Sequence, residues 1–347
     1  MRNNTNNPQP LLQLKDLSIG IHEKGQIYTA VDSISYNVYP GEILGVVGES
    51  GCGKTVTNLA IMGLLPDVLF IKGGEILYRT GNEPDSPVID LTKCSPDVRR
   101  SLNGSAMSII YQEPMTSLNP LMKVGKQAGE ALRIHQKLPP EEIHRRVLEA
   151  FEDVGLPDPN GIAQCYPHQL SGGQRQRVMI AMATLLNPRL LIADEPTTAL
   201  DVTIQAQVLA LLKRINREKN TSIIFISHDL AVIRQICDRV IVMYAGRIAE
   251  TGTTADILER PVHPYTNGLI ASIPKASAKG RNLANIPGHV PSTEEKRLPC
   301  PFANRCVFAV LRCRTAPPKE HRLSDTHTCS CHYAVSFAAE YRKQEGR

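Results

Sequence analysis

The octapeptide Gly48-Glu49-Ser50-Gly51-Cys52-Gly53-Lys54-Thr55 constrains the fold of this chain more than any other segment. The apolar run Ile43–Val47 precedes it and predicts a buried strand, and residues 55–65 follow with a helical pattern that stops at Pro66. The glycines allow backbone N–H groups to turn inward toward phosphate oxygens, at the positive end of the following helix. This strand, loop and helix therefore predict a nucleotide-phosphate site rather than a chance glycine turn.

Three side chains of this loop have predicted roles. Lys54 supplies a positive charge for the β- and γ-phosphates, and the Thr55 hydroxyl is a ligand for Mg²⁺. Cys52 is interpreted as a small filler of the loop, with a redox switch as the alternative. The expected ligands are therefore ATP and Mg²⁺.

A second apolar run, Leu190–Ala193, predicts a buried strand that ends in two carboxylates, Asp194 and Glu195. Carboxylates at the C-terminal end of a strand beside a phosphate loop are placed for ATP chemistry. We expect Asp194 to hold Mg²⁺ through water and Glu195 to polarise the attacking water as general base. The alternative is that two acidic residues simply begin a loop.

Strands alternate with helices along the chain, which predicts an α/β fold with a largely parallel sheet. A further buried strand is predicted at Ile223–Ser227, and Val240–Met243 with Ile248–Thr251 reads as a hairpin turning at Ala245-Gly246. Residues 121–165 are largely helical, with one apolar face and a stop at Gly155; that face comprises Ile143, Val147, Phe151 and Val154. From Pro261 onward the periodicity fades, so residues 261–347 are expected to form a separate appendage.

Leu170-Ser171-Gly172-Gly173-Gln174 resembles the LSGGQ signature of ABC ATPases, and it stands complete. Ser171 can cap a helix and the glycines expose N–H groups at its positive end. With the phosphate loop and the acidic strand, this resemblance implies a P-loop ABC ATPase with a RecA-like core, an antiparallel β subdomain and a helical subdomain inserted at about 113–170. In that family the signature binds the γ-phosphate of ATP held by an opposing subunit.

The resemblance also implies roles for single residues. Gln112, in Tyr111-Gln112-Glu113-Pro114, is similar to the Q-loop glutamine, which senses Mg²⁺ or water. Asp201, in Ala199-Leu200-Asp201, matches the D-loop, and His228 matches the switch histidine that contacts the γ-phosphate. Outside the family a lone histidine after a strand is usually an ordinary loop residue. The family stacks an aromatic ring on adenine, for which Tyr28 is the nearest candidate and Tyr36 another.

Segments of the tail resemble the peptide and nickel branch of ABC importers: His263-Pro264-Tyr265-Thr266, Ile286-Pro287-Gly288 and Cys300-Pro301-Phe302-Ala303-Asn304-Arg305-Cys306. Ser117-Leu118-Asn119-Pro120 is also similar to this branch. The resemblance implies an ATPase domain at 11–260 and an oligopeptide-transporter-type extension at 261–347. It implies peptide import, with nickel or glutathione import as alternatives. Its implied partners are a second and often unlike ATPase subunit, two transmembrane permease subunits and an extracytoplasmic binding protein.

Five of the nine cysteines crowd the last 48 residues, which in a reducing compartment suggests metal before disulfide. Four thiolates can hold Zn²⁺ or an iron–sulfur cluster, and the gaps here are wider than those of zinc knuckles. The family resemblance implies a [4Fe–4S] cluster on Cys300, Cys306, Cys313 and Cys331, with Cys329 as the competing fourth ligand. Free thiols are the alternative.

The remaining features limit the cellular role. The net charge of +5 is too small to predict a nucleic-acid groove. No apolar run approaches the ~18 residues of a membrane helix, and the polar start lacks the core of a signal peptide. We therefore expect a peripheral protein on the cytoplasmic face of the membrane. A soluble ABC protein of DNA repair or translation is the rival class, but the chain has a single cassette and no sustained heptads. A dead ATPase acting as an interaction module is disfavoured because the catalytic set is whole.

Overall fold

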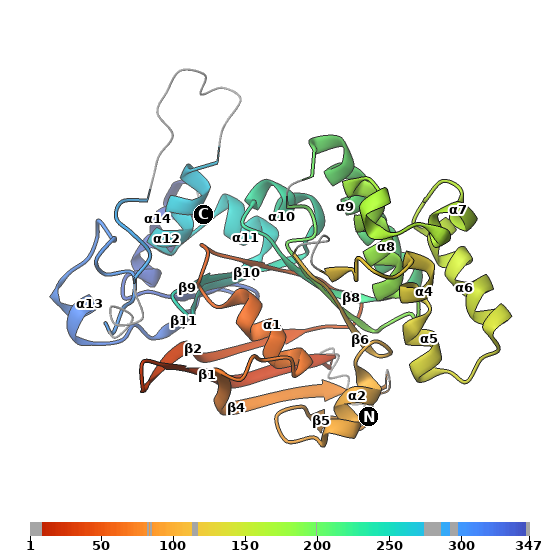
Figure 1. The fold of residues 1–347 in the computed structure, drawn as a ribbon. Coiled ribbons are helices and arrows are strands. Elements are labelled where there is room, and N and C mark those ends of the chain that lie inside the picture. Colours follow the sequence, from red (N-terminus) through yellow and green to blue (C-terminus); the bar gives the residue numbers. More distant parts are fainter. Residues whose placement is uncertain are drawn as a thin grey trace, which may run out of the picture. The chain divides into compact units, whose positions relative to one another are not determined.

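The structure is a computed structural model, and it describes residues 9–81, 83, 85–112, 117–198, 200–273, 286–291 and 298–344. The chain forms two compact units. The first comprises Met1–Gln13, Asn37–Ile43 and Leu77–Ile226, and the second comprises Leu14–Tyr36, Leu44–Ile76 and Ser227–Arg347. The elements are labelled in Figure 1.

The first unit contains three parallel strands, β6 (Met107–Ile110), β7 (Leu190–Asp194) and β8 (Ser222–Ile226). Their register places Ile109 beside Ile192, and Ile192 beside Ile224. Every residue of β7 and β8 is buried, which explains why both strands read as continuous apolar runs. The strands predicted at Leu190–Ala193 and Ile223–Ser227 are therefore confirmed to within one residue at each end.

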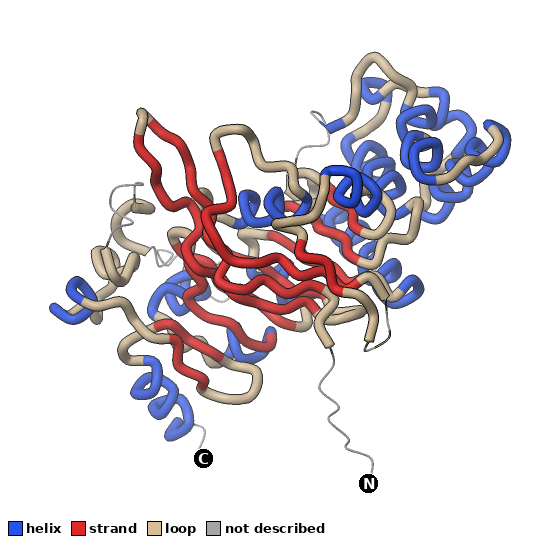
Figure 2. The backbone as a smooth tube through the Cα atoms, turned by 90° about the horizontal axis from the view of Figure 1, so that it is seen from below, coloured by secondary structure: helices blue, strands red, loops and turns tan. Residues whose placement is uncertain are grey.

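Helices make up most of the rest of the first unit. The predicted helical stretch 121–165 is confirmed as several short helices, and α6 buries Ile143, Val147 and Phe151. Gly155 follows α6 with φ 72°, a left-handed conformation that suits glycine. Figures 1 and 2 show α4 to α7 gathered clear of the strands of this unit. The elements are β5 (Val88–Asp90), α2 (Pro96–Leu102), α4 (Val124–Ala128), α5 (Glu130–His135), α6 (Pro140–Asp153), α7 (Pro159–Gln164), η1 (Pro167–Gln169), α8 (Gly172–Thr184) and α9 (Val202–Lys219).

The second unit holds most of β1 (Leu12–Glu23), β2 (Gln26–Val38) and β4 (Leu69–Arg79), which lie side by side in the order β2-β1-β4. β1 and β2 form a hairpin that turns at Lys24 and Gly25, both with positive φ. The remaining N-terminal elements are β3 (Ile43–Val47) and α1 (Lys54–Met62), as predicted for the segments on either side of the glycine-rich loop.

A second sheet portion of this unit has the strand order β11-β12-β10-β9-β3. The predicted hairpin is confirmed: β9 and β10 are antiparallel and turn at Ala245 and Gly246, with φ 48° and 86°. The elements are α10 (Leu230–Ile236), β9 (Arg239–Tyr244), β10 (Arg247–Thr253), α11 (Thr254–Glu259), α12 (Pro264–Ala271), α13 (Leu311–Thr315), β11 (Glu320–Arg322), β12 (Thr328–Ser330) and α14 (Ala334–Gln344).

The C-terminal region is joined to this sheet by backbone pairing and by a buried hydrogen bond between His327 and Glu250. β12 runs antiparallel to β10, with Glu250 opposite Cys329. Glu250 is fully buried, and its carboxylate contacts His327 Nε2 at 2.7 Å. The same carboxylate accepts hydrogen bonds from the backbone N–H groups of Val262 and His263. The appendage expected after residue 260 thus continues the sheet, and the domain boundary there stays a prediction.

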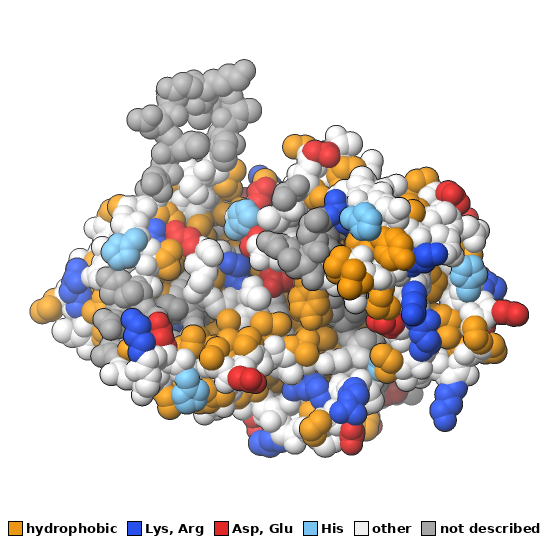
Figure 3. Space-filling view, in the orientation of Figure 1, with side chains coloured by type: hydrophobic (Ala, Val, Ile, Leu, Met, Phe, Trp, Pro, Cys, Tyr) orange, Lys and Arg blue, Asp and Glu red, His pale blue; other side chains and the backbone are white. Residues whose placement is uncertain are grey.

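The surface carries charges of both signs. Figure 3 shows Lys and Arg side chains interspersed with Asp, Glu and apolar side chains on the visible face of the described residues. On that face the positive side chains are not gathered into one band. Within the described part of the chain, no helix is both long and apolar enough to cross a membrane.

Phe151→Ala is expected to lower the free energy of unfolding by about 3–5 kcal/mol, because it leaves a cavity where a large ring is completely buried on α6. Urea unfolding measures the change. Ile134→Ala is the matched control, since that side chain is 70% exposed on α5 and its loss should change stability by less than ~0.5 kcal/mol. Equal effects of the two substitutions would contradict the packing of α6.

His263 is expected to make stability depend on pH between about 6.5 and about 4. Its Nδ1 accepts the backbone N–H of Tyr265 at the start of α12, and burial lowers its pKa to about 4 despite the opposing effect of Glu250. The unfolded state therefore binds the proton first as the pH falls. The stability that neutral His263 contributes is complete above pH ~6.5 and declines as the pH falls toward 4.

Thermal unfolding at pH 7, 6 and 5 measures this dependence. His263→Asn should flatten it over this range, since Asn can also cap a helix but does not titrate. An unchanged pH dependence in the variant would show that His263 does not cause it.

Candidate functional site

The glycine-rich loop connects β3 to α1, and its backbone admits only glycine at key positions. Gly48, Gly51 and Gly53 have φ values of 156°, 75° and 104°. A Cβ placed on Gly48 would lie 2.2 Å from the carbonyl oxygen of Met243, and one on Gly53 would lie 2.9 Å from Val31. The loop therefore packs closely against β9, and its glycines allow backbone N–H groups to turn toward an anion.

Lys54 begins α1 and reaches back across the loop. Its Nζ donates to the carbonyl oxygens of Gly48 at 2.7 Å and Glu49 at 3.1 Å, and lies 3.7 Å from Cys52 Sγ. Lys54 and Cys52 are buried, whereas Thr55 is exposed in the first turn of α1. The backbone of Cys52 is in turn held by the hairpin turn, because Gly246 N–H donates to its carbonyl. The ammonium group is thus fixed on the loop where a phosphate would be contacted.

The two acidic residues at the end of β7, Asp194 and Glu195, have different environments in the first unit. Asp194 ends β7 and is buried, 3% exposed. Glu195 follows in a left-handed conformation with φ 47°, which costs about 1–3 kcal/mol for a residue other than glycine. Its Oε2 accepts from Gln112 Nε2 at 3.1 Å and from Thr198 Oγ1 at 2.8 Å. The unusual backbone and two donors therefore turn and fix the carboxylate that was predicted as general base.

The signature segment begins a helix as predicted. Ser171 Oγ accepts the backbone N–H of Gln174, and the side chain of Gln174 accepts the N–H of Ser171, which forms a capping box for α8. A Cβ on Gly172 would meet no atom within 4 Å, so the packing of this chain does not require glycine there. Asp201 caps α9 by accepting the N–H of Ile204, and Ala199 lies outside the described residues.

The structure thus divides the predicted site residues between its units. Gln112, Asp194, Glu195, Asp201 and the signature lie in the first unit, where Gln112 and Glu195 are in direct contact. The phosphate loop, Tyr28 and the exposed His228 lie in the second unit. Of the two adenine candidates, Tyr28 is partly exposed on β2, while Tyr36 is buried at 8% exposure and so has no free ring face. Tyr28 remains a prediction.

Two residues of the tail motifs contact the phosphate loop, a role that sequence reasoning did not assign to them. Tyr265 Oη accepts the backbone N–H of Glu49 at 2.9 Å, and Arg305 binds the Glu49 carboxylate with two nitrogens. Both contacts join residues more than 200 positions apart, and no motif or periodicity signals such a pair.

The cysteines of the C-terminal region fall into two environments. Burial and the nearby Cys300, Cys306 and Cys313 thiols raise the pKa of Cys331 to about 11. Cys329 is fully buried and packs with Val262 and Ala334, and burial together with the nearby Glu250 and Cys331 raises its pKa. Among the described residues, however, no group of three or more His, Cys, Asp or Glu side chains stands in a geometry that could hold a metal ion.

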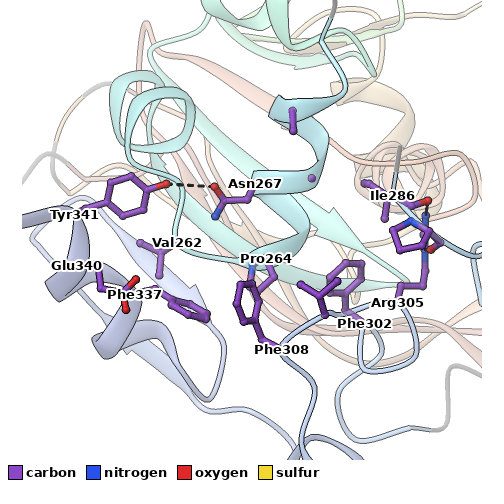
Figure 4. A pocket seen from close by; sticks show the side chains of 14 residues that line it. Val262, Pro264, Asn267, Ile286, Phe302, Arg305, Phe308, Phe337, Glu340 and Tyr341 are labelled. Atoms are coloured by element: carbon purple, nitrogen blue, oxygen red, sulfur yellow. Dashed lines mark hydrogen bonds between the residues drawn. The ribbon is translucent and has the colours of Figure 1, made fainter. Parts of the chain in front are cut away.

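A cavity of about 570 Å³ lies beside this region, lined by α12, α14 and residues 302–308. Figure 4 shows Phe302, Pro264 and Phe308 grouped near its centre and Arg305 beside Ile286 at one end. At the other end Tyr341 donates a hydrogen bond to Asn267. The cavity is mainly apolar, and the Arg305 guanidinium is turned toward its own hydrogen-bond partners.

Two family profiles match the chain. The profile described as "ABC transporter" matches residues 31–198, and the one described as "Oligopeptide/dipeptide transporter, C-terminal region" matches residues 249–313. The dipeptide transport ATP-binding protein DppD of Bacillus subtilis (strain 168) is 44% identical over 93% of this chain and 94% of its own length. DppD of Escherichia coli (strain K12) is 43% identical over 94% of this chain and 98% of its own length.

Solved structures agree in fold. The ATP-binding cassette MJ0796, in a dimeric post-hydrolysis state bound to ADP and Pi, matches with a TM-score of 0.61 and 26% identity over 70% of this chain and 98% of that one. CbiO1 from Clostridium perfringens, part of the ABC transporter complex cbiONQ, matches with a TM-score of 0.59 and 27% identity over 72% of this chain and 91% of that one. With its phosphate loop, its capped signature helix and near-complete alignment to the DppD proteins, the chain belongs to the ABC transporter ATPases, in the dipeptide and oligopeptide branch.

Proposed function

We propose that this chain is the ATP-hydrolysing subunit that powers import of dipeptides or oligopeptides through an ABC transporter. The observation that carries the proposal is its 44% identity to a dipeptide transport ATP-binding protein over 93% of the chain. The match extends through the C-terminal region that characterises this branch. Nickel or glutathione import by the same branch is the alternative, and a soluble non-transport ABC ATPase is the more distant one.

The proposed catalytic roles follow from the local geometry of each residue. Lys54 neutralises the β- and γ-phosphates from its position on the loop, and N–H groups of the loop bind the phosphate oxygens. Glu195 accepts a proton from the attacking water, while Gln112 and Thr198 hold its carboxylate in place. His228 contacts the γ-phosphate, and Tyr28 stacks on adenine.

Thr55 and Asp194 are the proposed residues for Mg²⁺, together with Gln112. A hydroxyl, a carboxylate and an amide oxygen are the hard ligands that Mg²⁺ prefers, and a buried carboxylate such as Asp194 favours a nearby cation. When bound, Mg²⁺ neutralises charge on the phosphate oxygens.

The signature is proposed to complete the site of a second ATPase subunit. Ser171 caps only the N–H of Gln174, and the other N–H groups in the first turn of α8 lie at the positive end of the helix dipole, which suits a γ-phosphate. The open space around Gly172 leaves room for a ligand to approach the backbone. The structural relative MJ0796 is dimeric with ADP and Pi, which supports a cassette dimer with Asp201 near its seam. The second subunit is either a copy or a different ATPase.

The remaining partners are proposed from the family. Two transmembrane permease subunits would carry the substrate, an extracytoplasmic binding protein would deliver it, and this chain would work at the cytoplasmic face of the membrane. Residues 11–260 would form the ATPase domain, with the helical subdomain at about 113–170, and residues 261–347 the extension. No nucleic-acid partner is proposed.

A [4Fe–4S] cluster on Cys300, Cys306, Cys313 and Cys331 remains a proposal, with Zn²⁺ as the alternative. Its support is that the Cys331 thiol is influenced by the other three, while Cys329 is not among them. The thiols as placed do not form a ready ligand set within the described residues, so their side chains would have to turn toward a common centre. No step of the ATP reaction is assigned to this centre.

Glu195→Gln is expected to keep ATP binding and to lower hydrolysis by about 10²–10⁴-fold, because the amide cannot accept the proton. In cells that lack this protein, the wild-type chain should restore uptake of a radiolabelled dipeptide. The variant should not restore it. Nickel and glutathione uptake are measured in the same cells. Restoration of nickel or glutathione uptake alone would contradict dipeptides or oligopeptides as the transported substrate. Near-normal ATP hydrolysis by the variant would contradict the role of Glu195 as general base.

Chain purified without oxygen is expected to carry about four iron atoms and to show the visible absorption of a cluster. Cys331→Ser should lose the iron, whereas Cys329→Ser, the matched control, should retain it. Zinc in place of iron, or iron lost only with Cys329, would overturn the cluster assignment or its fourth ligand.

A further inference from the structure

Arg305, in the cysteine-rich segment, forms an ion pair with the acidic residue of the phosphate loop. Its Nη1 lies 2.6 Å from Glu49 Oε2 and its Nη2 lies 3.0 Å from Glu49 Oε1, so the contact is a two-point fork. The Arg305 side chain is 6% exposed and that of Glu49 is 24% exposed. The pair is thus largely shielded from solvent, where charge interactions are stronger than at the surface.

The guanidinium is fixed from every side. Its hydrogen bond to Glu49 raises the pKa of Arg305, although burial opposes this. Each guanidinium nitrogen donates at least one hydrogen bond. The guanidinium group also lies over the Tyr244 ring. The other acceptors are Pro287 O for Nε, Tyr244 Oη for Nη1 and Ile286 O for Nη2. A lysine could not make this set of contacts, because they depend on the planar shape of the guanidinium.

The same region holds the loop backbone. Tyr265 is fully buried on α12 and packs against Tyr244 and Phe302, with ring centroids 4.6 Å and 5.5 Å away. Its Oη accepts the Glu49 N–H, so both the backbone and the side chain of Glu49 are bound by residues of the C-terminal region. The conformation at the start of the loop is therefore set by residues 265 and 305.

Glu49 presents an electrostatic difficulty that Arg305 removes. The loop that binds a polyanionic phosphate chain contains a carboxylate only five residues before Lys54. An unpaired carboxylate there would repel the phosphates and would also compete for the Lys54 ammonium group, whose Nζ already contacts the Glu49 backbone oxygen. Pairing with Arg305 compensates the charge of the carboxylate.

We propose that Arg305 is a positioning residue of the nucleotide site: through Glu49 it neutralises and shapes the phosphate loop, which makes the cysteine-rich segment part of the ATP-binding machinery. The inference rests on the proposed role of this loop in binding ATP. Arg305 contacts no phosphate itself. Arg305 directly precedes Cys306 and follows Cys300 by five residues, so the pair connects the cysteine segment to the loop.

The test measures the dissociation constant of the full-length chain for AMP-PNP, a non-hydrolysable ATP analogue, by titration calorimetry. Arg305→Ala should raise the constant by about tenfold or more, because it leaves Glu49 unpaired beside the phosphates. The double variant Arg305→Ala with Glu49→Gln should return to within about threefold of wild type, since the repelling charge is then gone. Arg305→Lys should give an intermediate value, because it keeps the charge but not the fork.

The control is Arg322→Ala, which removes an exposed arginine of the same region that pairs with Asp325 and should leave the constant unchanged. A wild-type constant in Arg305→Ala would overturn the proposal. A double variant as weak as the single one would also overturn it, because that result indicates a purely structural role. If Arg305→Ala does not fold, the test rests on Arg305→Lys. A dissociation constant equal to that of the wild type in Arg305→Lys would then refute the proposal. Failure of the wild-type chain to bind AMP-PNP would instead refute the proposed function.

Discussion

The close approach of the phosphate loop to the β9–β10 hairpin determines how the second unit is built. The carbonyl of Met243 occupies the position that a side chain at residue 48 would need, and the N–H of Gly246 binds the carbonyl of Cys52. Gly246 also accepts the N–H of Asp32 through its own carbonyl, and Arg247 pairs with Asp32. Arg247, the first residue of β10, also binds the carbonyl of Pro299. The turn and this arginine therefore support the loop, the β1–β2 hairpin and the chain that leads to Cys300.

Local signals in the sequence were sufficient for the elements that carry the nucleotide chemistry. The run Ile43–Val47, the hairpin at Ala245-Gly246 and the cap at Ser171 each depend on neighbouring residues, so periodicity and turn chemistry predicted them correctly. The branch of the family also followed from motifs in the sequence.

The features that the sequence did not reveal are those that depend on tertiary contacts. The left-handed backbone of Glu195 is imposed by its surroundings, and nothing in the residue type indicates it. The partners of Glu49 lie 216 and 256 positions away, so no local pattern identifies them. The pairing of β12 with β10 was missed because three-residue strands carry too little alternation to be recognised. The sequence also did not show that Tyr36 is buried, which is the observation that argues against it as the adenine partner.

The pairing of β12 with β10 also limits how the chain can be shortened. A chain ending near residue 260 would keep the phosphate loop, the signature and the acidic strand, and it would look like a minimal cassette. It would nevertheless uncover one side of β10, leaving a row of unsatisfied backbone groups and the buried carboxylate of Glu250 at an open sheet margin. Such margins recruit strands from other molecules and lead to aggregation. The C-terminal region therefore protects the solubility of the cassette that it follows.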